Sequence, residues 1–409
     1  MPYPNAAAAL VLAAAAALLA ARPAPAQELD AAMPSVQPEV LRRSLVSMGD
    51  NARLLRVLDR ARRGRPIVVG VIGGSITAGA GASREEFRYG NRVAHWWRET
   101  FPGAPITFVN AGIGATGSDI GAHRVRRHLL ERRPDFVVAE YAVNDPNTPA
   151  AAETLEGIVR QVLALPNRPA MMLLFTMNRA GGNAQEQHGR VGRHYGLPMV
   201  SFRDAMWPEI GAGRVRWEDV EADEVHPNDR GHALCALFIE SALKRALAAL
   251  PAPGAPLPRV AALPAPLLSD TYQHTAMLSA DTVTAVRADG WSMADSTPWF
   301  GRSWTADQPG ATLELDLEGT AFSVVFYRVK GPMGRAEATV DDGPPATLEA
   351  WFSADWGGYD ACQLVARGLK PGRHRLRIRL LEEHAAASQG TRFEVRAVLA
   401  AGLPTAGRR

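Results

Sequence analysis

From residue 40 to residue 250, short apolar runs of strand length alternate with amphipathic stretches of helix length. This rhythm is typical of a parallel sheet that helices cover on both faces. We expect its strands at residues 67–72, 106–110, 136–141, 171–176 and 198–201. The helices are expected at residues 91–100, 119–132, 151–165 and 183–195, with a last one that Asn228 caps and that stops before Pro251. The sequence therefore predicts a three-layer α/β/α domain.

A change of hydrophobic period marks a second domain. Residues 251–269 are rich in proline and alanine and carry one charge, which is typical of a semi-rigid linker. Beyond them, apolar residues alternate with acidic ones over 313–318 and with arginines over 375–380, as in half-buried antiparallel strands. We therefore divide the chain into a leader (1–26), an α/β domain (27–250), a linker (251–269) and an all-β sandwich or jelly-roll domain (270–409).

The N-terminus resembles a cleaved secretory signal peptide. Residues 6–21 form an unbroken apolar run, and Arg22 and the small-residue sequence Ala24-Pro25-Ala26 follow it. The run is shorter than the ~20 apolar residues that a membrane-spanning helix needs. We expect cleavage near Ala26 and a secreted or periplasmic protein, with a retained anchor as the alternative. No other stretch is long and apolar enough to cross a membrane.

Composition excludes several classes of protein. With 47% hydrophobic and 21% charged residues the chain can bury a large core, so it is neither disordered nor fibrous. Its formal net charge of +3 gives no strong attraction to nucleic acid. The two cysteines, Cys235 and Cys362, match no metal-binding spacing. We expect two buried free thiols, with one disulfide as the alternative, and no metal or organic cofactor.

A glycine-flanked serine follows the first expected strand, in the sequence Gly73-Gly74-Ser75-Ile76-Thr77-Ala78-Gly79. The carboxyl edge of an open parallel sheet is where ligands bind. The segment matches neither of the glycine-rich phosphate-binding motifs. It also lacks the second glycine of the α/β-hydrolase nucleophile elbow, because Thr77 stands there. A serine nucleophile on a different strand-to-helix turn remains, and the glycines would leave its hydroxyl uncovered.

Other segments at strand or helix ends supply what such a serine needs, namely a base, an orienting group and oxyanion donors. Asp223 and His226 lie three residues apart just before the last helix, so the carboxylate can reach one imidazole nitrogen and leave the other for the serine. Asn144 ends the third strand and offers a neutral amide donor. A backbone N–H of Gly114 or Ala115, after the second strand, and that of Ser75 are further candidates.

These blocks, in this order, resemble the SGNH (GDSL-type) hydrolase family over residues 66–248. The resemblance implies a flavodoxin-like sheet and assigns the following roles: a triad of Ser75, His226 and Asp223, and an oxyanion hole of Ser75, Asn144 and Ala115 or the adjacent Gly114. The family's Gly-Asp-Ser reads Gly73-Gly74-Ser75 here, so the carboxylate before the nucleophile is missing. Glu140 and Asp145, near the same edge, are the two candidates to replace its hydrogen bonds.

The β domain contains five of the nine tryptophans, at positions 291, 299, 304, 351 and 356, together with Phe300 and Tyr359. Aromatic rings stack on sugars, but they also fill sandwich cores, so carbohydrate binding and packing both remain open. The glycines around Trp356 make its loop the best exposed candidate.

We therefore expect an exported serine esterase that removes acyl groups, acetyl above all, from carbohydrates or other small esters. The alternatives are a carbohydrate O-acyltransferase with the same triad and a glycan-binding protein on a degenerate hydrolase fold.

Overall fold

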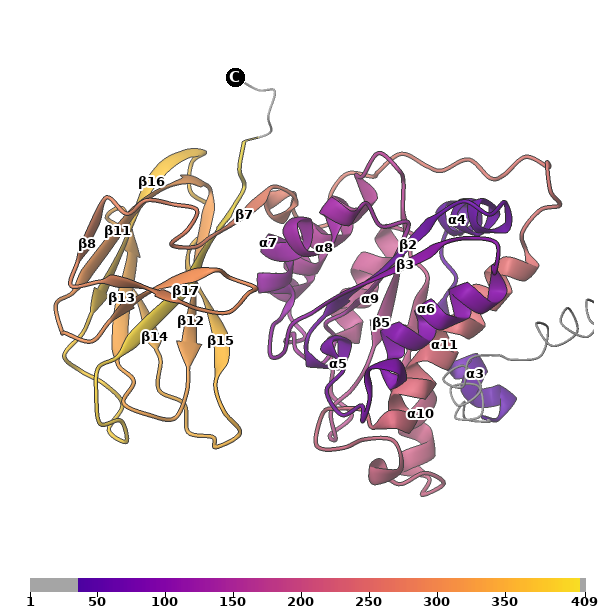
Figure 1. Ribbon diagram of the computed structural model, residues 1–409, viewed down its shortest axis with the longest axis horizontal. Helices are drawn as coiled ribbons and strands as arrows, with labels where there is room; N and C mark the ends of the chain where they lie inside the picture. The colour runs from indigo at the N-terminus through magenta and orange to yellow at the C-terminus, as the bar shows by residue number, and fades with distance from the viewer. Residues whose placement is uncertain (1–35, 405–409) are drawn as a thin grey trace, which may run out of the picture.

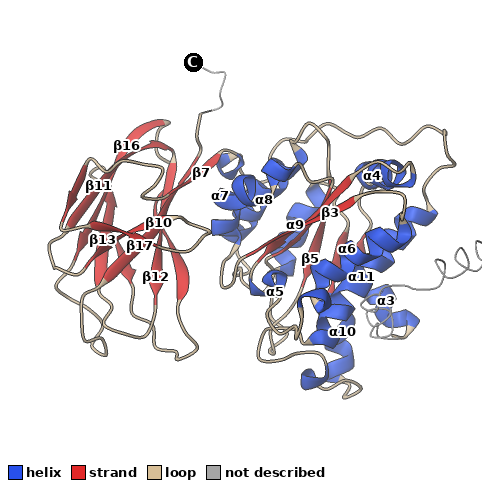
Figure 2. Ribbon diagram, viewed as in Figure 1, coloured by secondary structure: helices blue, strands red, loops and turns tan. Residues whose placement is uncertain are grey.

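The computed structural model describes residues 36–404, so the predicted leader lies outside the described residues. An α/β domain and an all-β domain lie side by side, and helices α7 and α8 face the β domain (Figures 1 and 2). Among residues 36–404, no helix combines the length and the apolar character needed to cross a membrane.

The first domain is built on a six-stranded sheet in the order β1-β6-β5-β4-β2-β3. Its strands are β1 (Leu45–Ser47), β2 (Ile67–Gly73), β3 (Ile106–Gly112), β4 (Phe136–Glu140), β5 (Ala170–Phe175) and β6 (Met199–Ser201). Its helices are α3 (Pro38–Ser44), α4 (Ala52–Arg62), α5 (Ser75–Ala78), α6 (Tyr89–Thr100), α7 (Ser118–His128), α8 (Pro149–Leu163), α9 (Gln185–His194), α10 (Phe202–Gly211) and α11 (Asp229–Ala248).

Two apolar layers hold this sheet between its helices. One layer joins the sheet to α3, α4, α6, α10 and α11, and the other joins it to α7, α8 and α9. The predicted three-layer architecture is therefore confirmed. Trp96 and Trp97 of α6 both lie in the first layer, where they are 7% and 0% exposed.

Several local features differ from the expectation, and helices α3 and α10 are among the elements that were not expected. The sheet has a sixth strand, β1, which pairs antiparallel with β6 and is too short to show a hydrophobic period. Helix α4, with an apolar face on the sheet, lies before the first expected strand, where no helix was predicted. The helix expected over 119–132 is interrupted at Leu129, which leaves the short 3-10 helix Leu130–Arg132 after α7. A β carbon on Gly70 would lie 2.5 Å from Leu129 Cδ1, so the Leu129 side chain packs directly on the backbone of β2.

The second domain is a sandwich of two antiparallel sheets, as predicted. One sheet contains β7 (Thr275–Leu278), β9 (Ser292–Asp295), β10 (Arg302–Ala306), β12 (Ala321–Arg328), β15 (Tyr359–Ala366) and β17 (Phe393–Ala401). The other contains β8 (Arg287–Asp289), β11 (Thr312–Gly319), β13 (Arg335–Val340), β14 (Ala346–Glu349) and β16 (Gly372–Leu380). The alternating apolar residues of β11 and β16 all point into the core between the sheets.

The segment between the domains is hydrogen-bonded to α8 at its C-terminal end. The buried carboxylate of Glu156, on α8, accepts hydrogen bonds from the backbone N–H groups of Leu267, Leu268 and Ser269 at 2.5, 2.8 and 3.1 Å. A second hydrogen-bonded anchor follows, because Gln161 Nε2 donates to the carbonyl oxygen of Tyr272. The chain therefore enters the β domain already fixed to α8.

The two domains share apolar contacts as well as hydrogen bonds. Ile120 of α7 packs with Phe300 and with residues of β12 and β17 in one buried cluster. Thr275 Oγ1 donates to the carbonyl oxygen of Ala122, and Arg367 forms an ion pair with Glu153 at 3.0 Å. This packing fixes the face of the β sandwich that lies beside α7 and α8.

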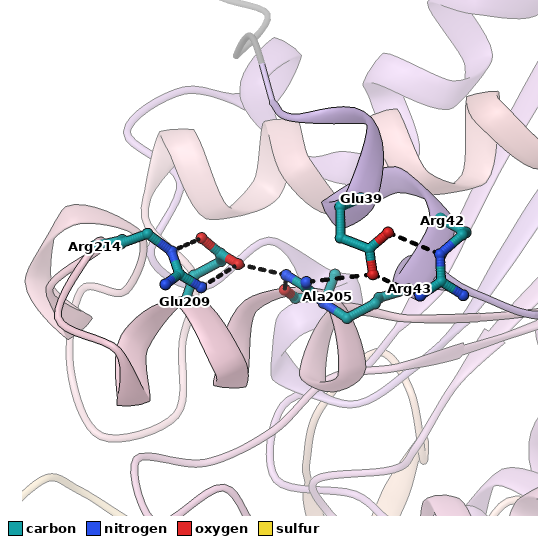
Figure 3. A network of polar contacts seen from close by, with 6 residues as sticks. All are labelled: Glu39, Arg42, Arg43, Ala205, Glu209 and Arg214. Carbon is teal, nitrogen blue, oxygen red and sulfur yellow. Dashed lines mark hydrogen bonds and ion pairs between the residues drawn. The ribbon is translucent and has the colours of Figure 1, made fainter.

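At the opposite end of the α/β domain, a charged network ties α3 to α10 (Figure 3). The carboxylate of Glu209 accepts from Arg43 at 2.5 Å and from Arg214 at 2.7 Å. Arg43 also donates to the carbonyl oxygen of Ala205, and Glu39 pairs with Arg42. The hydrogen bond from Arg214, opposed by partial burial and assisted by Arg43, lowers the pKa of Glu209 to about 2.

This network predicts a pH-dependent stability. The pKa of Glu209 is depressed on folding, so its contribution is present above the unfolded value near 4.5 and is lost as pH falls toward 2. We expect Glu209→Gln to lower the free energy of unfolding by roughly 1 kcal/mol at pH 6, because the ion pairs are partly exposed to solvent. At pH 2.5 the difference from wild type should largely vanish. Urea unfolding at both pH values measures it, with Glu131→Gln, an exposed glutamate, as control. A difference that is equal at both pH values would contradict the assignment.

Candidate active site

Ser75 lies at the carboxyl edge of the sheet, as the first residue of the short helix α5. In the strand register, Gly73 pairs with Gly112 of β3 and with Glu140 of β4, so the ends of three strands meet there. A β carbon on Gly73 would lie 2.1 Å from Thr77 Oγ1 and 2.3 Å from the carbonyl oxygen of Glu140. Only glycine lets the chain turn this tightly from β2 into α5.

Ser75, His226 and Asp223 form a continuous hydrogen-bonded chain. His226 Nε2 lies 2.8 Å from Ser75 Oγ, and His226 Nδ1 lies 2.7 Å from Asp223 Oδ2. An ionised carboxylate can only accept, so Nδ1 carries the proton and Nε2 is left to accept from the serine hydroxyl. The imidazole is thus oriented as a base for Ser75.

The loop before α11 holds this carboxylate ionised. Asp223 Oδ1 accepts from the backbone N–H groups of Val225 and His226 at 2.8 and 2.9 Å. Partial burial raises the pKa of Asp223, but the hydrogen bonds from the His226 side chain and from these two amides outweigh it, and the net pKa is lowered. Trp217 Nε1 donates to the carbonyl oxygen of Asp223 at 2.6 Å, which holds the backbone of Asp223 in place.

Asn228 anchors the same loop to the helix. Its side-chain oxygen accepts from the N–H groups of Arg230 and Gly231 and caps α11, as the sequence predicts, and its Nδ2 donates to the carbonyl oxygen of Glu218. The backbone N–H of Ala222 donates to the carbonyl oxygen of His226 at 2.7 Å. These bonds explain why the spacing of Asp223 and His226 produces the observed contact.

Besides the Ser75 N–H, the two other candidate sources of oxyanion donors lie near Ser75. Asn144 follows β4, and its buried Oδ1 atom has no hydrogen-bond partner. Its Nδ2 donates no hydrogen bond within residues 36–404, so it is available to a ligand. A β carbon on Gly114 would lie 3.9 Å from Ser75 Cβ, which places the loop after β3 beside the serine. Ala115 in that loop has a φ of 54°, an uncommon left-handed conformation for a residue other than glycine.

The structure gives a physical reason for glycine at position 74. A β carbon there would lie 2.2 Å from Asn144 Oδ1 and 2.8 Å from its Cγ, so the asparagine side chain occupies the space. Glu140 and Asp145 direct their hydrogen bonds elsewhere: Glu140 accepts from Thr176 Oγ1, and Asp145 accepts from the backbone of Ser118 and contacts His188. The space beside Gly74 is filled by an amide and not by another carboxylate.

Sequence reasoning named Glu140 and Asp145 at this edge but missed His188, which the structure places beside them. His188 of α9 lies 3.0 Å from Asp145, and both side chains are almost fully buried. Burial raises the pKa of Glu140 to about 7, against the effect of its hydrogen bond from Thr176. His188 belongs to no motif of the sequence, and only the folded chain brings it to Asp145. No group of three or more histidine, cysteine or acidic side chains within residues 36–404 is arranged to hold a metal ion.

A cavity of about 440 Å³ opens between the two domains and reaches the oxyanion candidates. The α/β domain contributes Ala115, Asn144 and Asp119, and the β domain contributes Arg328, Tyr359 and Gln363, among others. Ser75 and His226 do not line it, so it lies beside the hydrogen-bonded chain. Burial and the nearby Asp145 raise the pKa of Asp119 to about 6.

An aromatic cluster of the β domain adjoins this cavity through Tyr359, the one of its rings that lines the cavity. The ring of Trp356, which is 63% exposed, lies 5.1 Å from that of Phe352 and 5.8 Å from that of Tyr359. The guanidinium of Arg328 lies over the Phe352 and Tyr359 rings. By contrast, Trp291, Trp304 and Phe300 are buried in cores. The aromatic residues of the β domain thus divide between packing and an exposed surface.

Both cysteines are free, as expected. Cys235 is buried in the core of the α/β domain, whereas Cys362 is only partly buried and lines the cavity. They lie in different domains, and the alternative of a disulfide between them is wrong.

Comparison with known proteins identifies relatives of this architecture. The model of the GDSL-like lipase/acylhydrolase family matches residues 71–234. Two solved structures of a two-domain esterase active on acetylated mannans, one co-crystallised with mannopentaose, are each 33% identical to this chain, with a TM-score of 0.81. The alignments cover 89% of this chain and 98% and 99% of those chains. No curated protein sequence matches this chain.

The contact between Gly74 and Asn144 predicts the effect of adding one carbon atom. We expect Gly74→Ala to push the Asn144 side chain away and to lower kcat for an aryl acetate by about 100- to 1000-fold, the usual cost of one oxyanion donor, with little change in KM. Steady-state kinetics and a melting curve measure this. The control is Gly103→Ala, because a β carbon at Gly103 has no neighbour within 4 Å. Wild-type kcat in a folded Gly74→Ala variant would show that Asn144 is not held by this contact.

Proposed function

The chain belongs to the GDSL-like lipase/acylhydrolase family and is a carboxylic ester hydrolase, and on this premise we propose that it is an exported serine esterase that removes acetyl groups from a carbohydrate. The observation that carries the proposal is the hydrogen-bonded chain from Ser75 through His226 to Asp223, with contacts of 2.8 and 2.7 Å. These are the distances at which a base takes a proton from a serine nucleophile.

In the first half of the reaction, Ser75 Oγ attacks the ester carbonyl while its proton passes to His226 Nε2. The carbonyl oxygen becomes an oxyanion, which accepts from the Ser75 N–H, a backbone N–H of Gly114 or Ala115, and Asn144 Nδ2. His226 then gives its proton to the leaving sugar oxygen, and the bond between the carbonyl carbon and that oxygen breaks. The alcohol departs and an acyl-enzyme on Ser75 remains.

In the second half, water attacks the acyl-enzyme while His226 takes its proton. The same donors hold the new oxyanion, and His226 returns the proton to Ser75 Oγ as acetate leaves. Asp223 remains ionised throughout. It keeps the imidazole in the correct orientation and stabilises its charged form. The depressed pKa of Asp223 suits this role, because the carboxylate stays charged at neutral and mildly acidic pH.

The interdomain cavity supports a carbohydrate substrate. Its volume of about 440 Å³ and its mixture of polar and aromatic groups suit sugar units, which present hydroxyl groups at their edges and apolar faces above and below. The two-domain esterase that resembles this chain over almost its whole length acts on acetylated mannans. We infer that the glycan lies in this cavity, with its acetyl ester directed at Ser75 and a sugar ring against Trp356.

Export is part of the same proposal. The apolar run over 6–21 and the Ala-Pro-Ala sequence after it support a cleaved leader, and a polysaccharide substrate is reached outside the cytoplasm.

Replacing the proposed nucleophile tests the reaction. We expect Ser75→Ala to reduce acetate release from acetylated mannan and from an aryl acetate by about 10,000-fold or more, because the acyl-enzyme of the proposed mechanism forms on Ser75 Oγ. Acetate is measured directly, without an added acyl acceptor. The control is Ser292→Ala, an exposed serine of the β domain, which should keep full activity. Undiminished release by folded Ser75→Ala would refute the proposal, and release that requires an added sugar acceptor would favour an acyltransferase.

The role of the aromatic cluster has a separate test. We expect Trp356→Ala to raise KM for acetylated mannan by about tenfold, the loss expected for one stacking contact, and to leave kcat and the kinetics of an aryl acetate unchanged. Trp299→Ala is the matched control, since Trp299 is also exposed but its ring lies against His128, whereas the ring of Trp356 lies 5.8 Å from that of Tyr359, which lines the cavity. An unchanged KM for the polymer would place the glycan elsewhere.

A further inference from the structure

Arg124, on α7, is a fully buried arginine with 0% exposure. Within residues 36–404 it forms no ion pair, and its hydrogen bonds go instead to three uncharged oxygen atoms. Nη1 donates to the carbonyl oxygen of Ala111 at 2.6 Å, and Nη2 donates to that of Gly73 at 2.8 Å and to the hydroxyl of Tyr141 at 3.1 Å. Burial of a guanidinium without a carboxylate costs desolvation free energy, so a role that compensates for this cost is expected of Arg124.

The three partners of Arg124 belong to the three strand ends that carry the proposed oxyanion donors. Gly73 ends β2 and directly precedes Gly74-Ser75. Ala111 is the penultimate residue of β3, just ahead of the loop that contains Gly114 and Ala115. Tyr141 follows β4, and its backbone oxygen accepts from the N–H of Asn144 at 3.1 Å. One side chain therefore touches the chain immediately upstream of each donor.

The neighbouring sequence makes room for this arrangement. A β carbon on Gly121, one turn before Arg124 in α7, would lie 2.4 Å from Tyr141 Oη. Glycine at this position lets the tyrosine hydroxyl approach the helix and meet the guanidinium. The carbonyl of Gly73 also accepts from the backbone N–H of Ile113 at 3.1 Å, so the ends of β2 and β3 are bonded to each other as well as to Arg124.

We propose that Arg124 is a positioning residue for the oxyanion hole, which fixes the ends of β2, β3 and β4 relative to one another so that the donors on Ser75, Gly114 or Ala115, and Asn144 converge on one point. The guanidinium is planar and rigid, and its donors diverge at fixed angles, so it sets the spacing of the oxygen atoms that it binds. Donors in an oxyanion hole act only when they are held in place before the reaction. This inference rests on the proposed function, because it concerns the same site.

Substitutions that replace the Arg124 guanidinium by a smaller charged group or by an apolar group test the inference. We expect Arg124→Met, which keeps an unbranched stem but removes the guanidinium, to lower kcat for an aryl acetate by about 100-fold while KM changes less than about threefold, because the donors act on the oxyanion and not on the bound ester. Arg124→Lys keeps the charge but offers a single nitrogen atom, so we expect a smaller loss of about tenfold. Affinity for an alkyl boronic acid, which forms a tetrahedral adduct with the serine, should fall in parallel with kcat.

Arg160 provides a matched control for burial. It is 8% exposed, donates to the carbonyl oxygen of Pro264 and to the hydroxyl of Tyr195, and lies away from the strand ends at Ser75. We expect Arg160→Met to lower the melting temperature and to leave kcat unchanged. This comparison separates a loss of stability, which both arginines share, from a loss of oxyanion stabilisation, which is expected of Arg124 alone.

The outcomes are distinguishable from failure of the proposed function. If wild type releases acetate and Ser75→Ala does not, the esterase mechanism stands, and the Arg124 variants are decisive. A folded Arg124→Met with kcat within twofold of wild type would overturn the inference, as would a change confined to KM. If Arg124→Met does not fold, Arg124→Lys decides on the same criteria, with its folded fraction measured by circular dichroism. If wild type itself releases no acetate, the proposed function fails first.

Discussion

The structure depends on the parallel register that brings the ends of β2, β3 and β4 level at Gly73, Gly112 and Glu140. Ordinary side chains would not fit here, because a β carbon on Gly73 or Gly112 would meet neighbouring atoms within about 2.2 Å. The backbone can therefore turn sharply after each strand, and the three loops meet around Ser75. The His226 loop, which Asn228 ties to α11, then completes the site from the far side of the serine.

Several features of this arrangement could be predicted from the sequence. Apolar runs that end in glycine or asparagine mark the strand ends, and the spacing of Asp223 and His226 predicts their contact. The reason for glycine at position 74 could not be predicted. The side chain that excludes a β carbon there belongs to Asn144, which follows another strand. The sequence alone could not single out Arg124 either. It is one of many scattered arginines, and only its burial and its three oxygen partners distinguish it.

The packing of the two domains against each other could not be predicted from the sequence either. Period-2 runs predict the sandwich, and the aromatic residues indicate two possible roles for them. Trp291 and Trp304 are buried inside the sandwich itself, but the burial of Phe300 beside Ile120 and the place of Tyr359 at the cavity depend on how the β domain packs against α7 and α8. That orientation follows from contacts such as those of Ile120 and Arg367, which carry no pattern of their own. The cavity beside Asn144 exists only because the two domains meet in this way.

The hydrogen bonds from the backbone of residues 267–269 to the buried carboxylate of Glu156 limit how a protein of this architecture can evolve. A binding domain on a loose tether can be lost or exchanged without harm to its enzyme. Here Tyr272, Ala321 and Ala401 belong to the same apolar layer as the inner faces of α7 and α8. Excision of the β domain would expose the part of that layer that these three residues cover. A replacement domain would have to present a matching apolar surface. The β domain is thus a structural part of the catalytic unit and not an interchangeable module.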